Sequence, residues 1–136
     1  MDFLRSIAIA ASGLRAQAGR MRVIAENIAN ADSTASTPGG EPYRRKIPSF
    51  TSEIDRALDA RTIGLGRVKT DASDFRLKYE PGHPAADANG NVKYPNVNSL
   101  VEMMDMREAQ RSYEANINII TASRRMIQRT IEILKS

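Results

Sequence analysis

One histidine and a few carboxylates are the side chains of this sequence that could do chemistry. His83 is the sole histidine, and with Glu80 and Asp87 it could ligate a metal ion. It lies, however, in the turn sequence Glu80-Pro81-Gly82-His83-Pro84, where proline and glycine interrupt regular structure. A structural role in that turn is therefore favoured, and the sequence predicts no metal and no cofactor.

The other candidates for binding or catalysis fail on spacing. Residues 85–96 faintly resemble a calcium loop, but the first ligand position holds Ala85 and the twelfth, where glutamate belongs, holds Asn96. Glu108 and Arg111 are three residues apart, the spacing of an exposed ion pair on a helix. Phosphate-binding loops, dinucleotide fingerprints and nucleophile elbows are absent from the sequence. It predicts a protein that is not an enzyme.

Both ends of the chain have a helical repeat in which apolar positions alternate in steps of four and three. The N-terminal seam consists of Phe3, Ile7, Ala10, Leu14, Gln17, Met21, Ile24 and Ile28. The C-terminal seam consists of Met103, Met106, Gln110, Tyr113, Ile117, Ile120, Arg124, Ile127, Ile131 and Leu134. We expect these seams to pack the two helices together and against other subunits. Gln110 and Arg124 either lie at the seam edge or set the register between helices.

The helix ends are set by capping residues. The first helix is expected from Asp2, which can cap it, to about Asn30, with Gly13 and Gly19 allowing close approach of another helix. The second is expected to begin near Ser99, where Ser99-Leu100-Val101-Glu102 matches a capping box, and to continue to the C-terminus.

Between the helices the sequence predicts loops and short strands. Residues 33–40 form a loop, and 50–61 are ambiguous between helix and strand. Segments 64–70, 75–79 and 92–94 are expected as strands of one small antiparallel unit over about 64–95, with a turn at Asn89-Gly90. The predicted fold class is mainly α, with the terminal helices paired as a coiled coil and this β unit and loops between them. The predicted division is 1–32, 33–98 and 99–136.

Charge and composition exclude several classes of protein. The net charge is +4, and Arg44-Arg45-Lys46 is the only tight basic run, predicted to be a solvated face and not a nucleic-acid site. Aromatic residues make up only 5%, too few for a membrane-active amphipathic helix. No stretch approaches the roughly 20 apolar residues of a membrane span. The residues after Met1 do not resemble a cleaved secretion signal.

Several motifs together resemble the flagellar rod and hook axial protein family, most closely the subunits of the proximal rod. The matching stretches are residues 12–17, 27–31, 40–46, 79–90, 94–98, 102–104 and 112–116. The resemblance as a whole extends over nearly the entire chain except about 51–72. Glu41 and Asn91 depart from the family pattern, both at loop positions.

The resemblance implies a structural subunit of a helical tubular drive shaft that crosses the periplasm and transmits torque from motor to hook. The implied partners are further copies, other rod proteins, the flagellar type III export apparatus and the surrounding membrane ring or adaptor proteins. Another rod or hook subunit, or a generic coiled-coil adaptor, are the alternatives. The motif residues expected to make loop contacts are Asn27, Asn30, Tyr43, Arg44, Arg45, Pro81, Gly82, His83, Pro84, Asn89, Gly90, Tyr94, Pro95 and Asn96.

Overall fold

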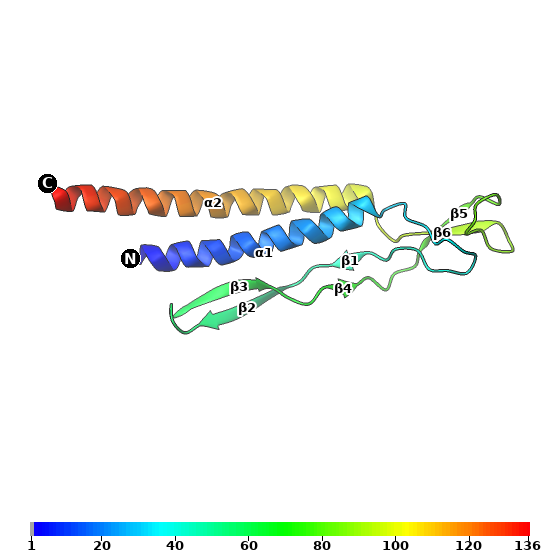
Figure 1. Ribbon diagram of the computed structural model, residues 1–136, viewed down its shortest axis with the longest axis horizontal. Helices are drawn as coiled ribbons and strands as arrows, with labels where there is room; N and C mark the ends of the chain where they lie inside the picture. Colours follow the sequence, from blue (N-terminus) through cyan, green and yellow to red (C-terminus); the bar gives the residue numbers. More distant parts are fainter. Residues whose placement is uncertain (1) are drawn as a thin grey trace. The chain divides into compact units, whose positions relative to one another are not determined.

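Two long helices at the ends of the chain, with three small antiparallel sheets between them, make up the computed structural model, which describes residues 2–136 (Figure 1). Helix α1 spans Phe3–Ala29 and helix α2 spans Ser99–Lys135. The predicted terminal helices and antiparallel strands are therefore confirmed, although six strands in the middle make "mainly α" a loose description. Within residues 2–136, neither helix is long and apolar enough to cross a membrane.

Helix α1 begins and ends close to the predicted residues. The Asp2 carboxylate caps it, because Oδ1 accepts a hydrogen bond from the Arg5 backbone N–H at 3.2 Å. At the other end Asn30 follows the last helical residue, and its side-chain amide donates to the Glu26 carbonyl at 2.9 Å. The Glu26 carbonyl also accepts from the Asn30 backbone N–H at 3.1 Å, so this half-buried side chain adds a second hydrogen bond at the end of the helix.

Helix α2 starts at the predicted residue with a different cap. Asn98 Oδ1 accepts a hydrogen bond from the Leu100 backbone N–H at 3.1 Å, so the capping side chain lies one residue before Ser99. The capping-box prediction is wrong because Glu102 does not turn back to the cap. Its carboxylate is buried and pairs with Arg45 instead.

The strands pair in three separate two-stranded sheets. Strands β1 and β4 pair antiparallel, as do β2 with β3 and β5 with β6. Their bounds are β1 Lys46–Ile47, β2 Phe50–Asp55, β3 Ala60–Leu65, β4 Lys69–Thr70, β5 Arg76–Tyr79 and β6 Asn91–Tyr94. The prediction of one β unit over 64–95 is therefore wrong. The ambiguous segment 50–61 supplies β2 and the start of β3, and this local hairpin takes up Gly64 and Leu65.

The chain divides into two compact units, and each combines a part of α1, a part of α2 and a part of the chain between them. The first unit contains the residues up to Met21, Ser49–Arg67 and Arg107–Ser136. The second contains Arg22–Pro48 and Val68–Met106. Both helices contribute to both units. The division into 1–32, 33–98 and 99–136 stays a prediction.

In the first unit, small residues of α1 allow other elements to come close. A methyl group added at Gly13 would lie 2.9 Å from Asn116 Nδ2 of α2, so the expected close approach of another helix is present at this glycine. One added at Gly19 would lie 2.8 Å from Leu65 Cδ2, so here the neighbour is strand β3 and not a helix. The first unit therefore packs α1 against both α2 and the β2–β3 hairpin (Figure 1).

The second unit has a small apolar core together with buried polar groups. The Arg76 guanidinium of β5 donates to the Ala31 carbonyl at 3.0 Å and to the Pro95 carbonyl at 3.1 Å. It thereby holds the β5–β6 hairpin to the end of α1. The buried core side chains of this unit include Val23, Ile24, Val92, Pro95 and Val97.

The turn between β5 and β6 requires glycine at position 90. Gly90 has φ +82°, and a methyl group there would lie 2.8 Å from the Tyr79 ring and 3.2 Å from Pro81 Cβ. We expect Gly90→Ala to lower the free energy of unfolding by about 1–2 kcal/mol for the left-handed backbone, plus about 1–3 kcal/mol for overpacking. Urea unfolding measures the change.

Gly39→Ala is the matched control for that substitution. Gly39 has nearly the same dihedral, φ +81°, but a methyl group there would have no neighbour within 4 Å. It should therefore show the backbone cost of about 1–2 kcal/mol alone. Equal losses for the two variants would contradict the packing role of Gly90.

Candidate functional site: a polar network at the start of α2

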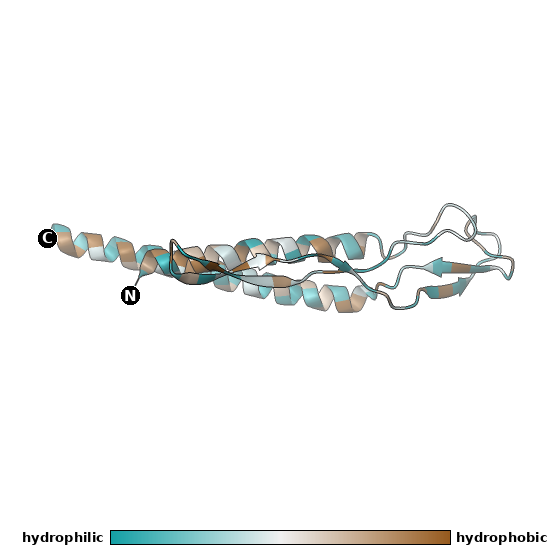
Figure 2. Cartoon of the chain, turned by 90° about the horizontal axis from the view of Figure 1, so that it is seen from below, coloured by the Kyte–Doolittle hydropathy of each residue, from teal (hydrophilic) through white to brown (hydrophobic). Residues whose placement is uncertain are grey.

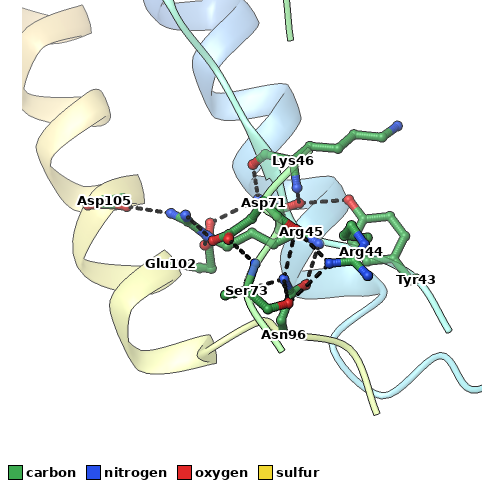
Figure 3. A network of polar contacts seen from close by, with 10 residues as sticks. Tyr43, Arg44, Arg45, Lys46, Asp71, Ser73, Asn96, Glu102 and Asp105 are labelled. Atoms are coloured by element: carbon green, nitrogen blue, oxygen red, sulfur yellow. Dashed lines mark hydrogen bonds and ion pairs between the residues drawn. The ribbon is translucent and has the colours of Figure 1, made fainter. Parts of the chain in front are cut away.

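The buried carboxylate of Glu102, in the first turn of α2, is the centre of a polar network (Figure 3). Its side chain is only 1% exposed. Arg45 Nε donates to Oε1 at 2.5 Å, and Asn27 Nδ2 donates to Oε2 at 3.2 Å. A buried charge is tolerated only when it is paired and hydrogen-bonded. Both oxygens of Glu102 meet that condition, with partners from two other segments of the chain.

The side-chain amide of Asn27 connects α1 to strand β1. Asn27 is fully buried. Its Oδ1 accepts from the Tyr43 hydroxyl at 2.7 Å and from the Lys46 backbone N–H at 2.9 Å, while Nδ2 donates to the Lys46 carbonyl at 2.8 Å. The amide thus acts as a substitute strand partner for β1. Replacing it would leave backbone groups of β1 without partners.

Arg45 joins the acidic residues of the network. Its guanidinium lies 3.4 Å from Asp71 Oδ2 and 3.8 Å from Asp105 Oδ2, and its backbone N–H donates to Asn96 Oδ1 at 2.7 Å. The hydrogen bond to Glu102 raises the pKa of Arg45 above its already high ordinary value. The prediction of a solvated basic face is therefore wrong for Arg45, since carboxylates from α2 and from the segment after β4 surround it.

Arg44 and Asn96 fix the backbone that follows β4. Arg44 Nη1 donates to the Asp71 carbonyl at 2.9 Å and the Ser73 carbonyl at 3.1 Å, and its guanidinium lies 4.2 Å from the centre of the Phe75 ring. Asn96 Nδ2 donates to the same Asp71 carbonyl at 3.1 Å. Hydrogen bonds from Ser73, and then the nearby Arg45, lower the pKa of the Asp71 carboxyl.

The turn residues that could have formed a metal site have structural partners. His83 Nδ1 accepts from the Ala85 backbone N–H at 3.0 Å, and Glu80 Oε2 accepts from the Tyr94 hydroxyl at 2.8 Å. Asp87 Oδ1 accepts from two backbone N–H groups of the turn. No group of three metal-ligating side chains occurs among residues 2–136. Of the remaining motif residues, Pro81, Gly82, Pro84 and Asn89 are exposed, and Gly90 and Pro95 are buried.

The two predicted seams differ in how the single chain covers them. All eight positions of the N-terminal seam, residues 3–28, are buried or half-buried. In the C-terminal seam, Met106, Tyr113, Ile120 and Ile127 are half-buried. The other six positions of this seam are exposed, namely Met103, Gln110, Ile117, Arg124, Ile131 and Leu134. Each of the first four exposed positions, from Met103 to Arg124, is preceded by a small or polar residue that the chain does cover. These covered residues are Glu102, Ala109, Asn116 and Ser123.

The arrangement of the network positions chain segments and does not suit catalysis. Glu102, Asp71 and Asp105 are all engaged by Arg45, so none is a free base beside a nucleophile. The network instead connects α1, the β1–β4 pair and α2 through charge-assisted hydrogen bonds.

The pKa of the Tyr43 phenol should report, in a pH titration, that this side chain lies in the network. Burial, followed by the Glu26 and Glu102 carboxylates, raises the pKa of Tyr43 to about 12. The folded chain therefore favours the neutral phenol, whose contribution to stability is complete below pH 10 and is lost as the pH rises from 10 through about 12. We expect a phenolate absorbance step near pH 12 whose size decreases in Tyr43→Phe. The hydrogen bond to Glu80 also raises the pKa of Tyr94, so the size of the step is compared and not its presence. A step of unchanged size in this variant would contradict the assignment.

Two family models match the ends of the chain. The model described as "Flagella basal body rod protein" matches residues 7–35, and the model described as "Flagellar basal body rod FlgEFG protein C-terminal" matches residues 88–133. The first covers most of α1, and the second covers β6 and nearly all of α2. Asn27 and Glu102, which meet in the network, therefore lie in different matched segments.

Full-length relatives agree with these models. A protein of Agrobacterium fabrum is 51% identical over 128 residues, covering 94% of this chain and 92% of its own length. Relatives from Salmonella typhimurium and Bacillus subtilis are 42% and 39% identical and cover at least 98% of both chains. All three are named flagellar basal-body rod protein FlgC. The chain belongs to the FlgC family of flagellar basal-body rod proteins.

Proposed function

We propose that this chain is a structural, non-catalytic subunit of the proximal rod of the bacterial flagellar basal body. It assembles with further copies and with other rod proteins into a helical tubular shaft, which crosses the periplasm and transmits torque from motor to hook. The observation that carries this proposal is the similarity to FlgC proteins over nearly the full length of both chains. Head-to-tail contacts that do not close on themselves generate such an open helical assembly.

The two terminal helices pair as a coiled coil through the N-terminal and C-terminal seams. The close approach at Gly13 and Asn116, each one residue before a seam position, supports a pairing of the two helices. The exposed half of the C-terminal seam, which includes Ile117, Ile131 and Leu134, faces neighbouring subunits, because exposed apolar positions in a helical repeat favour burial on assembly. In this arrangement residues 1–32 and 99–136 form the helical core and 33–98 the region between.

The polar network makes the subunit stiff where loops would otherwise bend. A shaft that transmits torque needs segments that hold their relative orientation under load. Glu102, Arg45 and Asn27 join three segments by hydrogen bonds that are stronger than neutral ones because a charge takes part. The motif residues Tyr43, Arg44 and Asn96 support the same joint.

The remaining proposed partners are those that a subunit at the base of the rod would meet. The subunit is exported through the flagellar type III apparatus without a cleaved signal, and it meets the surrounding membrane ring or adaptor proteins. The turn residues Pro81, Gly82, Pro84 and Asn89 are exposed and are available for such contacts. Neither nucleic acid nor a membrane span is part of the proposal.

An in-frame deletion imaged by electron cryotomography of whole cells tests the rod role. We expect motors that retain rings and export gear but lack rod and hook, with both restored by the wild-type gene on a plasmid. Intact hook-basal bodies in the deletion strain would overturn the proposal. A generic adaptor role would then become the leading alternative.

A further inference from the structure

Asn89-Gly90 is the only place in the sequence where glycine follows asparagine. An asparagine is chemically labile in this context, because the next backbone nitrogen can attack the side-chain amide carbon and glycine has no side chain to obstruct the approach. The other asparagines precede isoleucine, valine, alanine or serine. Asn89 is exposed in segment 80–90, which joins β5 to β6 and lacks the strong hydrophobic bands of the two helices (Figure 2). Sequence and exposure alone therefore mark Asn89 as a site of spontaneous deamidation.

The reaction needs only water. The Gly90 nitrogen forms a bond to Asn89 Cγ, and the side-chain nitrogen leaves as ammonia together with the proton that the Gly90 nitrogen loses. The product is a cyclic succinimide. Water then breaks one of its two C–N bonds, which gives aspartate if the bond at Cγ breaks and isoaspartate if the original peptide bond breaks. Ring closure thus requires a free Gly90 nitrogen that can face Asn89 Cγ.

The folded turn engages this attacking nitrogen. The Gly90 N–H donates to the Asp87 carbonyl at 3.0 Å, which closes a β-turn over residues 87–90. The Asp87 N–H in turn donates to the Asn91 carbonyl at 3.0 Å. The Gly90 nitrogen can therefore lose its proton and turn toward Cγ only after the turn has opened.

The backbone of the turn also gives Asn89 the wrong torsion angle for ring closure. Asp59 is the only non-glycine residue with positive φ among residues 2–136, so Ala88 and Asn89 both have negative φ. A closed β-turn with these signs is of type I, in which ψ of the second central residue is about 0°. At that ψ the Gly90 nitrogen eclipses the backbone nitrogen of Asn89, whereas the nearly planar ring requires it to eclipse Cβ.

The Asp87 side chain holds the turn in this conformation. Its Oδ1 accepts from the Asn89 N–H and from the Asn91 N–H, both at 2.9 Å. These two N–H groups flank Gly90, so rotating the Asn89 backbone toward ring closure strains or breaks both hydrogen bonds. The carboxylate also places a negative charge beside the nitrogen that must lose its proton, and this opposes the first step.

Packing around Gly90 adds a further barrier. Gly90 is buried, and its carbonyl accepts from the Glu80 N–H at 2.9 Å. A methyl group added at Gly90 would lie 2.8 Å from the Tyr79 ring and 3.2 Å from Pro81 Cβ, so both side chains cover this position. Opening the turn therefore disrupts the end of the β5–β6 hairpin and not only one hydrogen bond.

We propose that Asn89 is a latent deamidation site, which the folded turn protects and the unfolded chain exposes. Isoaspartate at this position then accumulates with the time that the chain spends unfolded. It adds a methylene group to the backbone between two N–H groups that share one Asp87 oxygen, so a modified chain cannot restore the turn. The inference does not depend on the rod role, because it concerns the folded and unfolded states of a single chain.

Peptide mapping by mass spectrometry tests the inference on the unmodified chain. Samples are kept at mildly alkaline pH, either folded in buffer or unfolded in guanidinium chloride. Trypsin then releases residues 79–93, which contain Asn89 and also Asn91 as an internal control followed by valine. We expect Asn89 to deamidate at least about tenfold faster in the unfolded chain, the factor that corresponds to about 1.4 kcal/mol of opening free energy. Equal rates in the two states would overturn the inference.

Asp87→Ala tests whether the turn provides the protection. It removes two hydrogen bonds and the charge but keeps the backbone carbonyl that closes the turn. We expect the folded variant to deamidate at Asn89 at least about fivefold faster than the folded wild type, which corresponds to about 1 kcal/mol for the lost hydrogen bonds. An unchanged rate in the folded variant would overturn the inference.

Glu41→Ala is the matched control for Asp87→Ala. It removes an exposed acid from a loop of the same unit and should leave the rate at Asn89 unchanged. An equal acceleration in this variant would show that the loss of any nearby acid is sufficient, and would also overturn the inference. Circular dichroism verifies that each variant is folded. If Asp87→Ala does not fold, the comparison of the folded and unfolded wild type decides alone.

Discussion

Arg45→Ala should lower the free energy of unfolding by about 3–5 kcal/mol, the largest single loss we expect from the network. The substitution leaves the Glu102 carboxylate, 1% exposed, without its counter-charge, and breaking a buried pair from one side costs this much. Urea unfolding followed by circular dichroism measures the loss. Arg22→Ala removes an exposed arginine from α1 and should change stability by no more than about 0.5 kcal/mol.

A double variant separates two contributions to the free energy of unfolding: the cost of leaving one charge unpaired, and the net contribution of the Arg45–Glu102 ion pair. Replacing Arg45 and Glu102 together by methionine removes both charges and keeps apolar volume, a change that is often neutral or stabilising for buried pairs. We therefore expect the double variant to be more stable than Arg45→Met alone. Additive losses would contradict a direct interaction between the two side chains, because independent sites add and coupled ones do not.

Ile117→Asp should abolish motility and leave the single subunit folded. Ile117 is 40% exposed in the chain and belongs to the uncovered half of the C-terminal seam. An aspartate there reaches water in the free subunit, so we expect a stability change of no more than about 1 kcal/mol. On assembly the same charge would be buried without a partner, which opposes association. Swimming in soft agar and unfolding of the purified chain measure the two effects.

Asn118→Asp is the control, since it adds the same charge at an exposed polar position one residue further along. It should swim normally. Ile24→Asp is not an equivalent test, because Ile24 is 2% exposed within its own chain and the substitution would unfold the subunit. Normal swimming of the Ile117→Asp strain would show that this seam position does not lie in the interface between subunits.

The helices could be predicted because their signals are local. The alternating steps of four and three predict both terminal helices. Asp2 predicts where α1 begins, and the absence of proline from residues 99–136 predicts that α2 continues to the end. The observed bounds agree with these predictions within a residue. The Asn89-Gly90 turn was equally readable, since Gly90 takes the positive φ that such a turn requires.

The polar network and the strand pairing could not be predicted, because they join residues far apart in sequence. Asn27 and Glu102 are separated by 75 positions, and no local pattern relates them. Glu102 fitted a capping box by spacing, yet its buried carboxylate has a stronger partner in the half-buried Arg45 than in the helix start. The resemblance singled out Asn27, Tyr43, Arg45 and Asn96 as motif residues without indicating that they share one site.

The interleaving of the two units sets the order in which the chain can fold. Each unit draws on segments from near both ends, so a chain that emerges gradually from a channel cannot complete the second unit until residues 22–106 are all outside. The first unit needs the last segment, 107–136, as well. Long-range closure of this kind is slow because loop entropy is lost before contacts compensate for it. If the subunit is exported through a channel as proposed, its first unit therefore stays incomplete until both terminal segments, up to Met21 and from Arg107, are outside, whichever end leads.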